Sequence, residues 1–207
     1  MKSARIRTSA LAAAAALTLP LSLGVLASQA SAASPSPSPS VSPFGPGCSS
    51  LPQNGSGSAV EMAKERVATA IANNPELSEL NDAIKKANLT TTLDDLKGST
   101  VFAPTNDAFN KLGTAKKDAL LNNPTQLKKV LRYHVVEHKT ITKADLPNGD
   151  FTTLEGSKIT TSGSGTSFKV NGSAPITCGD ITTKNATVYI VDGILIPPTA
   201  TATPSPS

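Results

Sequence analysis

The clearest hydrophobic pattern in the chain is a short uncharged run that ends at a proline and leads into a helix start. Residues 100–104 are Thr-Val-Phe-Ala-Pro, and β-branched and aromatic side chains of this kind favour a buried strand. Pro104 cannot donate a ladder hydrogen bond, so the strand should end there. Thr105 or Asn106 can then cap a helix, and Asp107 falls in its first turn, where the helix dipole favours negative charge. The pattern predicts a strand that turns sharply into a helix.

Three longer segments have apolar residues at the three- and four-residue steps of an amphipathic helix. Two of them begin at an Asn-Pro pair, in which Asn74 or Asn123 can cap the helix while the proline takes the first helical position. A further turn is expected just before Gly98, which can end it. The predicted helical segments are residues 59–72, 74–87, 93–96 and 123–134.

The C-terminal part changes to short Thr-, Val- and Ile-rich runs separated by Gly, Ser and Asn, which predict a β-meander. The longest strand signal, residues 187–196, is apolar almost throughout and is followed by two prolines. Because helices come first and strands last, without βαβ alternation, the sequence predicts an α+β fold. The meander strands are expected at residues 151–154, 158–162, 167–170 and 176–177.

The two ends of the chain differ in composition from its middle. Residues 1–32 have basic residues first, then an Ala/Leu-rich run, then Ala-Ser-Ala, which is the pattern of a secretory signal peptide. An uncleaved membrane anchor is the alternative, and the shortness of the run and its internal proline and glycine disfavour it. Residues 33–47 and 199–207 are rich in Ser, Thr and Pro and are expected to be disordered spacers, with or without O-linked sugar. The folded domain is expected at residues 48–198.

The formal charge of +4 overstates the basic character of the folded part. Three of the nineteen basic residues lie in the predicted signal peptide, which holds no acidic residue, so sixteen basic residues face fifteen acidic ones in the remainder. A nearly neutral protein gives no charge-based reason to expect binding to nucleic acid or to an anionic membrane surface. With no Trp and two Tyr, the chain also has few side chains for stacking on bases. We expect no nucleic-acid partner and no membrane insertion after signal cleavage.

The chain has two cysteines, Cys48 and Cys178. In an exported protein two well-separated cysteines most simply form one disulfide, which would close a loop of about 130 residues. The alternative makes Cys48 the lipid-modified cysteine of a bacterial lipoprotein. That role needs the cysteine next to the apolar core of the signal, whereas here a Ser/Pro-rich run lies between them.

Few residues form a pattern that supports catalysis or cofactor binding. His134 and His138 have the spacing of two metal ligands on one helix face, but the valines between them favour a strand, which would point the rings differently. His134 with Asp107 or Asp192 has the composition of a base and its orienting partner, yet no serine lies in a Gly-x-Ser-x-Gly elbow. A semi-buried His134 bonded to a neighbouring group is the simpler interpretation. We therefore expect no enzymatic activity, no metal and no cofactor.

Three segments together resemble a fasciclin (FAS1) domain: residues 100–109, residues 131–136 with their Tyr-His pair, and residues 186–198. Their order and spacing fit one complete domain. The likeness is stronger to small secreted single-domain bacterial members, of the major secreted immunogenic protein type, which also have a Gly-Cys pair near the start and a second cysteine before the last strands. The signature residues in these segments are Thr105, Asn106, Asp107, Phe109, Tyr133, His134 and Asp192.

The resemblance implies a single domain in which a wedge or sandwich of β-sheets has several helices packed around it. It also implies a role in adhesion or extracellular protein interaction. In animal relatives the Tyr-His segment is implicated in integrin binding, which makes Tyr133 and His134 the candidate interaction residues here. The signatures are otherwise expected to be architectural. Asp107→Ala is accordingly expected to cost roughly 0.5–2 kcal/mol of stability and to leave binding intact.

Two functions follow as hypotheses. The first is a secreted, monomeric, non-enzymatic fasciclin-domain protein, extracellular or associated with the cell wall, that binds an extracellular or cell-surface protein or glycan. The second is an extracellular carrier of small molecules or lipids, or a cleft enzyme, that uses the region around His134. A roomy apolar pocket with His134 exposed in it would favour the second hypothesis. A buried and hydrogen-bonded His134 with no cavity beside it would remove its basis.

Overall fold

A computed structural model describes residues 42–198 of the chain, and the predicted signal peptide, most of the predicted N-terminal spacer and the predicted C-terminal tail lie outside them. The described part combines helices in its first half with a sheet in its second, which confirms the α+β class. The helices are η1 (Pro46–Ser50), α1 (Ala59–Met62), α2 (Val67–Ala72), η2 (Pro75–Leu77), α3 (Ser78–Lys86), α4 (Thr90–Asp94), α5 (Asn106–Lys111), α6 (Thr114–Leu121), α7 (Pro124–Tyr133) and η3 (Lys143–Asp145). The strands are β1 (Ser99–Pro104), β2 (Val135–Val136), β3 (Asn148–Thr152), β4 (Lys158–Ser164), β5 (Ser167–Val170), β6 (Ala174–Thr182) and β7 (Ala186–Val191).

The strands form one seven-stranded sheet in the order β2-β1-β7-β6-β5-β4-β3. All neighbours are antiparallel except β1 and β7, which run parallel from the pair Ser99–Ala186 to the pair Pro104–Val191. The meander predicted from the C-terminal pattern is confirmed by β3 to β6. The sheet also curls until its two ends approach each other, since the N–H of Leu154, just after β3, donates to the C=O of Val135 in β2 (2.7 Å).

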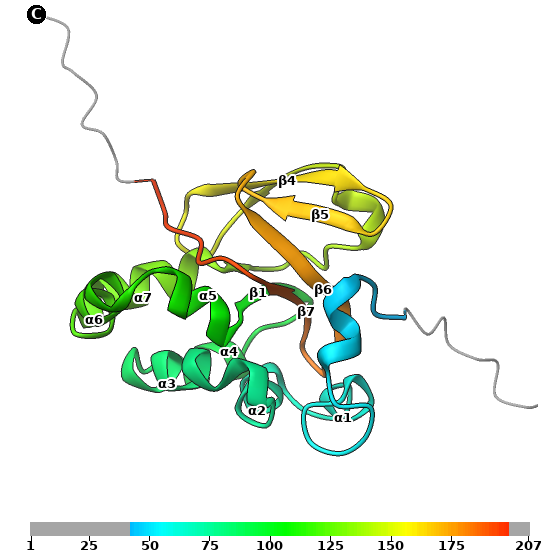
Figure 1. Ribbon diagram of the computed structural model, residues 1–207, viewed down its shortest axis with the longest axis horizontal. Helices are drawn as coiled ribbons and strands as arrows, with labels where there is room; N and C mark the ends of the chain where they lie inside the picture. The colour runs from blue at the N-terminus through cyan, green and yellow to red at the C-terminus, as the bar shows by residue number, and fades with distance from the viewer. Residues whose placement is uncertain (1–41, 199–207) are drawn as a thin grey trace, which may run out of the picture. The chain divides into compact units, whose positions relative to one another are not determined.

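The sheet bends at strand β6. Its pairing with β7 is interrupted by irregularities between Ile176 and Cys178 and again between Cys178 and Ile181. Asp180 within this stretch has a positive φ of 64°. Bulges of this kind bend a strand and increase its local twist. Figure 1 shows the result: β6 runs from the β4–β5 pair across to β7.

Every residue of β1 and β7 is buried, because the two strands face a hydrophobic core on each side. On one side Val101 and Val188 join a core built with the helices. On the other side Phe102 and Tyr189 join a second core enclosed by the curled sheet. Figure 1 shows α2 to α7 on the side of β1 and β7 that faces away from β4 and β5. Burial on both faces explains why these strands are the most uniformly apolar in the sequence.

The predicted helix over residues 59–72 is wrong in its continuity, because α1 and α2 are separated by a turn. The loop between β6 and β7 causes the break. The side-chain oxygen of Asn185 accepts the N–H of Val67 (2.8 Å), and the C=O of Glu65 accepts the N–H of Lys184 (2.8 Å). These distant groups replace the partners that a continuous helix would supply.

The predicted strand over residues 187–196 is shorter in the structure, where β7 ends at Val191. Its parallel neighbour β1 ends opposite it at Pro104, so the ladder has no partner beyond that point. The remaining residues leave the sheet, and Leu195 returns to the core with an exposure of 2%. Pro197, expected to stop the strand, therefore lies well past its end.

The ordered domain begins earlier than the predicted boundary at Cys48. Phe44 is 9% exposed and pairs with Gly179 in β6 through two backbone hydrogen bonds (3.1 and 2.8 Å). Its ring makes edge contacts with Phe168 and Tyr189, at centroid distances of 5.7 and 6.3 Å. Phe44 therefore belongs to the folded domain, because this aromatic side chain gains burial in the second core. We call residues 44–50 the N-terminal strap.

No helix in the described part of the chain is long and apolar enough to cross a membrane.

Candidate functional site

The signature segments meet where β1 and β7 end and where α7 joins β2. Thr105 is the N-cap of α5, because its hydroxyl accepts the N–H of Ala108 (3.1 Å). Its own N–H donates to the C=O of Val191 at the end of β7 (3.0 Å). Thr105 thus resolves the choice of cap that the sequence left open and ties the helix start to the sheet.

Asn106 holds α5 against the start of α3. Its side-chain oxygen accepts the N–H of Glu79 (3.0 Å) and the hydroxyl of Ser78 (3.2 Å), and its amide donates to the C=O of Pro75 (2.9 Å). The side chain therefore satisfies groups at a helix N-terminus that have no intrahelical partner. Phe109 is buried in the core beneath this junction, at 2% exposure.

Tyr133 is buried and uses its hydroxyl twice. The hydroxyl donates to the C=O of Lys158 in β4 (2.8 Å) and accepts from the side-chain amide of Asn171 (3.0 Å). A buried tyrosine of this kind has no hydrogen-bonding capacity left for an external partner. Its role in the structure is to join the end of α7 to the meander.

His134 is also buried, with 2% of its surface exposed. Its Nε2 accepts the N–H of Leu195 (3.0 Å), so the proton lies on Nδ1, which donates to the C=O of Val130 (2.8 Å). Burial lowers the pKa of His134 to about 4, while the bond to Val130 acts in the opposite direction. The ring is neutral at pH 7 and links the end of α7 to the chain after β7.

The side chains of Tyr133 and His134, the candidate interaction residues, are thus both enclosed and hydrogen-bonded. The cavity beside His134 is about 20 Å³ and is lined mainly by apolar residues such as Leu80, Ile84 and Leu131. A volume of this size has room for about one water molecule. The roomy pocket that a carrier or cleft enzyme would need is therefore not found at His134.

Asp107 and Asp192 lie at a different place, in a cavity of about 140 Å³ that Glu76 also lines. We call it the acidic pocket. Asp192 forms an ion pair with Lys111, while its Oδ1 atom is buried without a hydrogen-bond partner among the described residues. The alternative pairing of His134 with one of these aspartates is not observed, because both ring nitrogens bond to backbone groups. The described residues contain no group of three or more His, Cys, Asp or Glu side chains placed to hold a metal ion.

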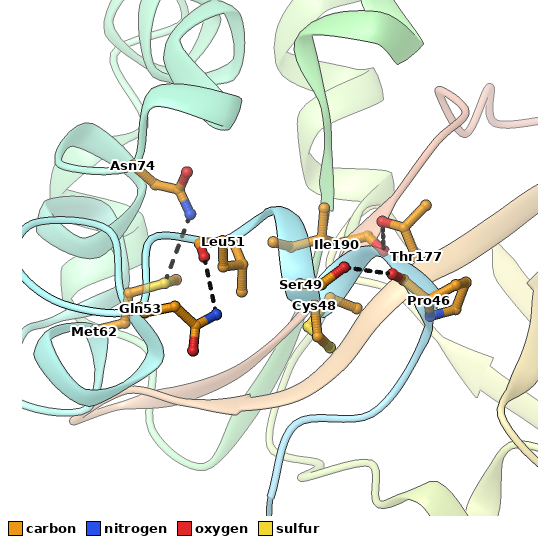
Figure 2. The surroundings of a disulfide bond; sticks show 10 residues. Pro46, Cys48, Ser49, Leu51, Gln53, Met62, Asn74, Thr177 and Ile190 are labelled. Atoms are coloured by element: carbon orange, nitrogen blue, oxygen red, sulfur yellow. Dashed lines mark hydrogen bonds between the residues drawn. A yellow bond between two sulfur atoms is a disulfide. The ribbon is translucent and has the colours of Figure 1, made fainter.

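Cys48 and Cys178 form the expected disulfide, which ties the N-terminal strap to β6. Figure 2 shows the bond beside Thr177, whose hydroxyl donates to the C=O of Ile190 (3.1 Å). The strap lies so close to β6 that a Cβ built on Gly45 would come within 2.3 Å of the C=O of Thr177. Because both cysteines of the chain are in this bond, neither thiol is available as a nucleophile, a metal ligand or a site of lipid attachment.

Two residues that organise the fold, Asn185 and Phe44, could not be identified from sequence patterns. Asn185 caps α2 and also donates to the C=O groups of Leu93 and Asp94 (2.8 and 3.1 Å). Its partners are about 90 to 120 residues away in the chain, so no local pattern marks it. Phe44 stands alone in a Pro/Gly-rich context, and only its size and apolarity hint at burial.

Comparison with known proteins identifies the family of the chain. The family model of the Fasciclin domain matches residues 75–197. The chain is 41% identical over 162 residues to the immunogenic protein MPB70 of Mycobacterium bovis, covering 74% of this chain and 82% of that protein. It is 42% identical over 161 residues to the cell surface glycolipoprotein MPB83 of the same species, covering 74% and 72%.

More distant similarities were also found. Protein sll1483 of Synechocystis is 37% identical over 129 residues, covering 61% of this chain and 71% of that protein. A solved structure described as a FAS1 domain pair from the insect cell adhesion molecule Fasciclin I aligns with a TM-score of 0.48 and 18% identity, over 60% of this chain and 46% of that one.

Proposed function

The chain belongs to the fasciclin-domain family, and from this premise we propose that it is a secreted or cell-surface, non-enzymatic module for adhesion or extracellular interaction. Its partner is an extracellular or cell-surface protein or glycan, and the domain acts as a monomer. The similarity to a cell surface glycolipoprotein supports an extracellular location. The disulfide supports it as well, since such bonds persist in oxidising compartments.

The observation that carries the proposal is the internal use of the signature's polar side chains. The side chains of Asn106, Tyr133 and His134 each bond to backbone groups of other elements, and the hydroxyl of Thr105 caps α5. Side chains engaged in this way stabilise the fold, and those of Tyr133 and His134 are also buried. Recognition of a partner is therefore assigned to the outer surface of the domain.

The proposal is tested by capture from the native cell envelope. The chain without its predicted signal peptide is coupled to beads at a micromolar concentration in the bead volume. The beads are mixed with detergent-solubilised envelope, and bound molecules are cross-linked before the wash. We expect a specific protein or glycan to be retained by the folded domain and lost when the domain is reduced and unfolded before coupling. Equal retention by folded and unfolded protein, or none by either, would contradict an interaction module.

The location is tested separately by fractionating the producing cells. We expect the processed protein in the medium or released from the wall by high salt. A cytoplasmic protein of full precursor mass would contradict it.

A further inference from the structure

Four exposed basic side chains converge on one pocket between the end of α3 and α7. The pocket has a volume of about 480 Å³ and we call it the basic pocket. Figure 1 shows α3 and α7 on the same side of the sheet, and the two helices are in contact. The remaining lining is polar or small and includes Asn88 and Thr125. The basic residues of the pocket are Lys86, Lys128, Lys129 and Arg132.

One acidic residue, Glu155, lies in the same lining, and it pairs with Lys129 at 3.3 Å. Arg132 donates to the C=O of Leu154 (2.9 Å), a neutral acceptor that leaves its charge uncompensated. In the part of the chain that the structure describes, Lys86 and Lys128 have no acidic partner within ion-pair distance. The pocket thus holds four positive charges against one negative charge.

This concentration does not follow from the composition of the domain. The described residues hold sixteen basic and fifteen acidic side chains, a net charge of +1, whereas the basic pocket alone carries +3. Lys128 and Arg132 are four residues apart on α7, a spacing at which like charges repel and destabilise a helix. The fold therefore maintains an unfavourable cluster that an external anion would relieve.

The chemistry of the lining limits which anion fits. No aromatic residue lines the pocket, so it offers no ring for stacking on nucleic-acid bases. Among the described residues the large hydrophobic side chains that are exposed are Val60 and Ile196, and neither lines this pocket, so nothing there would insert into a membrane. Thr125, in the first turn of α7, and Asn88 add neutral hydrogen-bonding groups and a helix end that favours negative charge. An acidic sugar chain carries both anionic groups, which the basic side chains can bind, and hydroxyls, which the neutral polar groups can bind.

We propose that the basic pocket binds an anionic polysaccharide, with Lys86, Lys128 and Arg132 contacting its acidic groups. This inference rests on the proposed function and names one partner class and one site for it. Glu155 limits the affinity because it competes with the ligand for Lys129. Binding should weaken steeply with salt, since the association of cations with a polyanion releases counterions.

The test measures binding of the chain without its predicted signal peptide to dextran sulfate, with neutral dextran of the same length as the negative probe. The site variant is Lys86→Gln with Lys128→Gln. The matched control is Lys116→Gln with Lys169→Gln, two exposed lysines outside the pocket that give the same change in net charge. At 50 mM salt we expect the site variant to bind roughly tenfold more weakly than wild type, with a log–log salt slope smaller by about two. The control should bind within about twofold of wild type.

A third variant, Glu155→Gln, removes the one acidic side chain of the pocket. In wild type the carboxylate of Glu155 accepts the N–H of Ser157 (3.2 Å), and the amide oxygen of the glutamine can still accept it. It should bind dextran sulfate a few-fold more tightly than wild type. Equal losses in the site variant and the control would overturn the proposal, because net charge alone would then explain binding. Tighter binding of poly-glutamate or of vesicles with 30% phosphatidylglycerol than of dextran sulfate would also overturn it in favour of an acidic protein or a membrane.

The same variants separate this inference from the proposed function. If the site variant still captures its envelope partner as wild type does, the basic pocket is excluded as the site while the interaction module stands. If wild type captures nothing from the envelope yet binds dextran sulfate through the pocket, the anion site stands and the proposed function fails.

Discussion

At the scale of single residues, the polar signature side chains act as internal connectors. Asn106, Tyr133 and His134 each join backbone groups of elements that are distant in sequence. Removing such a connector leaves buried donors or acceptors without partners, which costs more than the bond itself contributed. This accounts for polar residues in otherwise apolar segments without invoking a catalytic role.

His134 makes stability depend on pH. The ring has an ordinary pKa of 6.5 when unfolded and about 4 in the fold, so between these values the unfolded chain binds a proton that the folded chain does not. Stability should therefore fall as pH drops from 6.5 towards 4, by up to about 3 kcal/mol from this residue. Urea unfolding at half-unit pH steps measures the slope.

The control for this prediction is His134→Gln, which cannot titrate. It should be less stable than wild type at pH 7, because the contacts to Val130 and Leu195 are altered. Its stability should nevertheless change less between pH 6.5 and 4. An unchanged slope in the variant would show that carboxylates elsewhere cause the acid sensitivity.

The start of α5 gives a second prediction at this scale. Thr105 makes the capping hydrogen bond, so Thr105→Ala should lower the free energy of unfolding by about 1 kcal/mol. Asp107 is exposed and contributes through the helix dipole, so Asp107→Ala should cost less, about 0.3–1 kcal/mol. Thermal melts of both variants show which loss of stability is larger. Thr105→Ser is the control, because it keeps the capping hydroxyl. A larger loss for Asp107→Ala would contradict it.

At the scale of elements, most strands and helices could be predicted because their signals are local. The turn at Pro104 and the Asn-Pro helix starts depend on neighbouring residues, and the structure contains them. The break between α1 and α2 and the early end of β7 depend on Asn185 and on the length of β1, which no local pattern contains. Sequence reasoning fails here because the missing partners come from the other end of the chain.

Asn185, a half-buried residue, should therefore be among the most sensitive loop positions. Asn185→Ala leaves the N–H of Val67 and two carbonyl groups near the end of α4 without this partner. We expect a loss of about 1–3 kcal/mol in the free energy of unfolding, with faster amide exchange in α2. Lys184→Ala is the matched control, since Lys184 contributes its backbone N–H and its side chain is exposed. Equal losses in the two variants would contradict the capping role.

At the scale of the whole molecule, the two cores and the charge distribution could not be predicted from the sequence, because both depend on which distant segments meet in space. The curled sheet creates the second core by bringing β2 close to the end of β3. Likewise, Lys86 meets the basic residues of α7 through packing of two helices that lie about 40 residues apart in sequence. Net charge and periodicity describe the chain in one dimension, whereas both features arise from its path in space.

The N-terminal strap offers the last prediction, because a covalent bond and an aromatic contact hold the same segment. Loss of the disulfide with Cys48→Ser and Cys178→Ser should lower stability by about 5 kcal/mol in the loop-entropy view, since 130 residues separate the cysteines. Phe44→Ala should cost about 3–5 kcal/mol when the disulfide is present, because the ring packs on Phe168 and Tyr189.

The two changes should not be additive. Without the disulfide the strap detaches more readily, so Phe44→Ala should cost at least about 1 kcal/mol less in the cysteine-free protein than in wild type. Urea unfolding of the four proteins in this cycle measures the difference. If the costs add to within about 0.5 kcal/mol, the strap stays docked through Phe44 alone. The disulfide would then act only by restricting the unfolded chain.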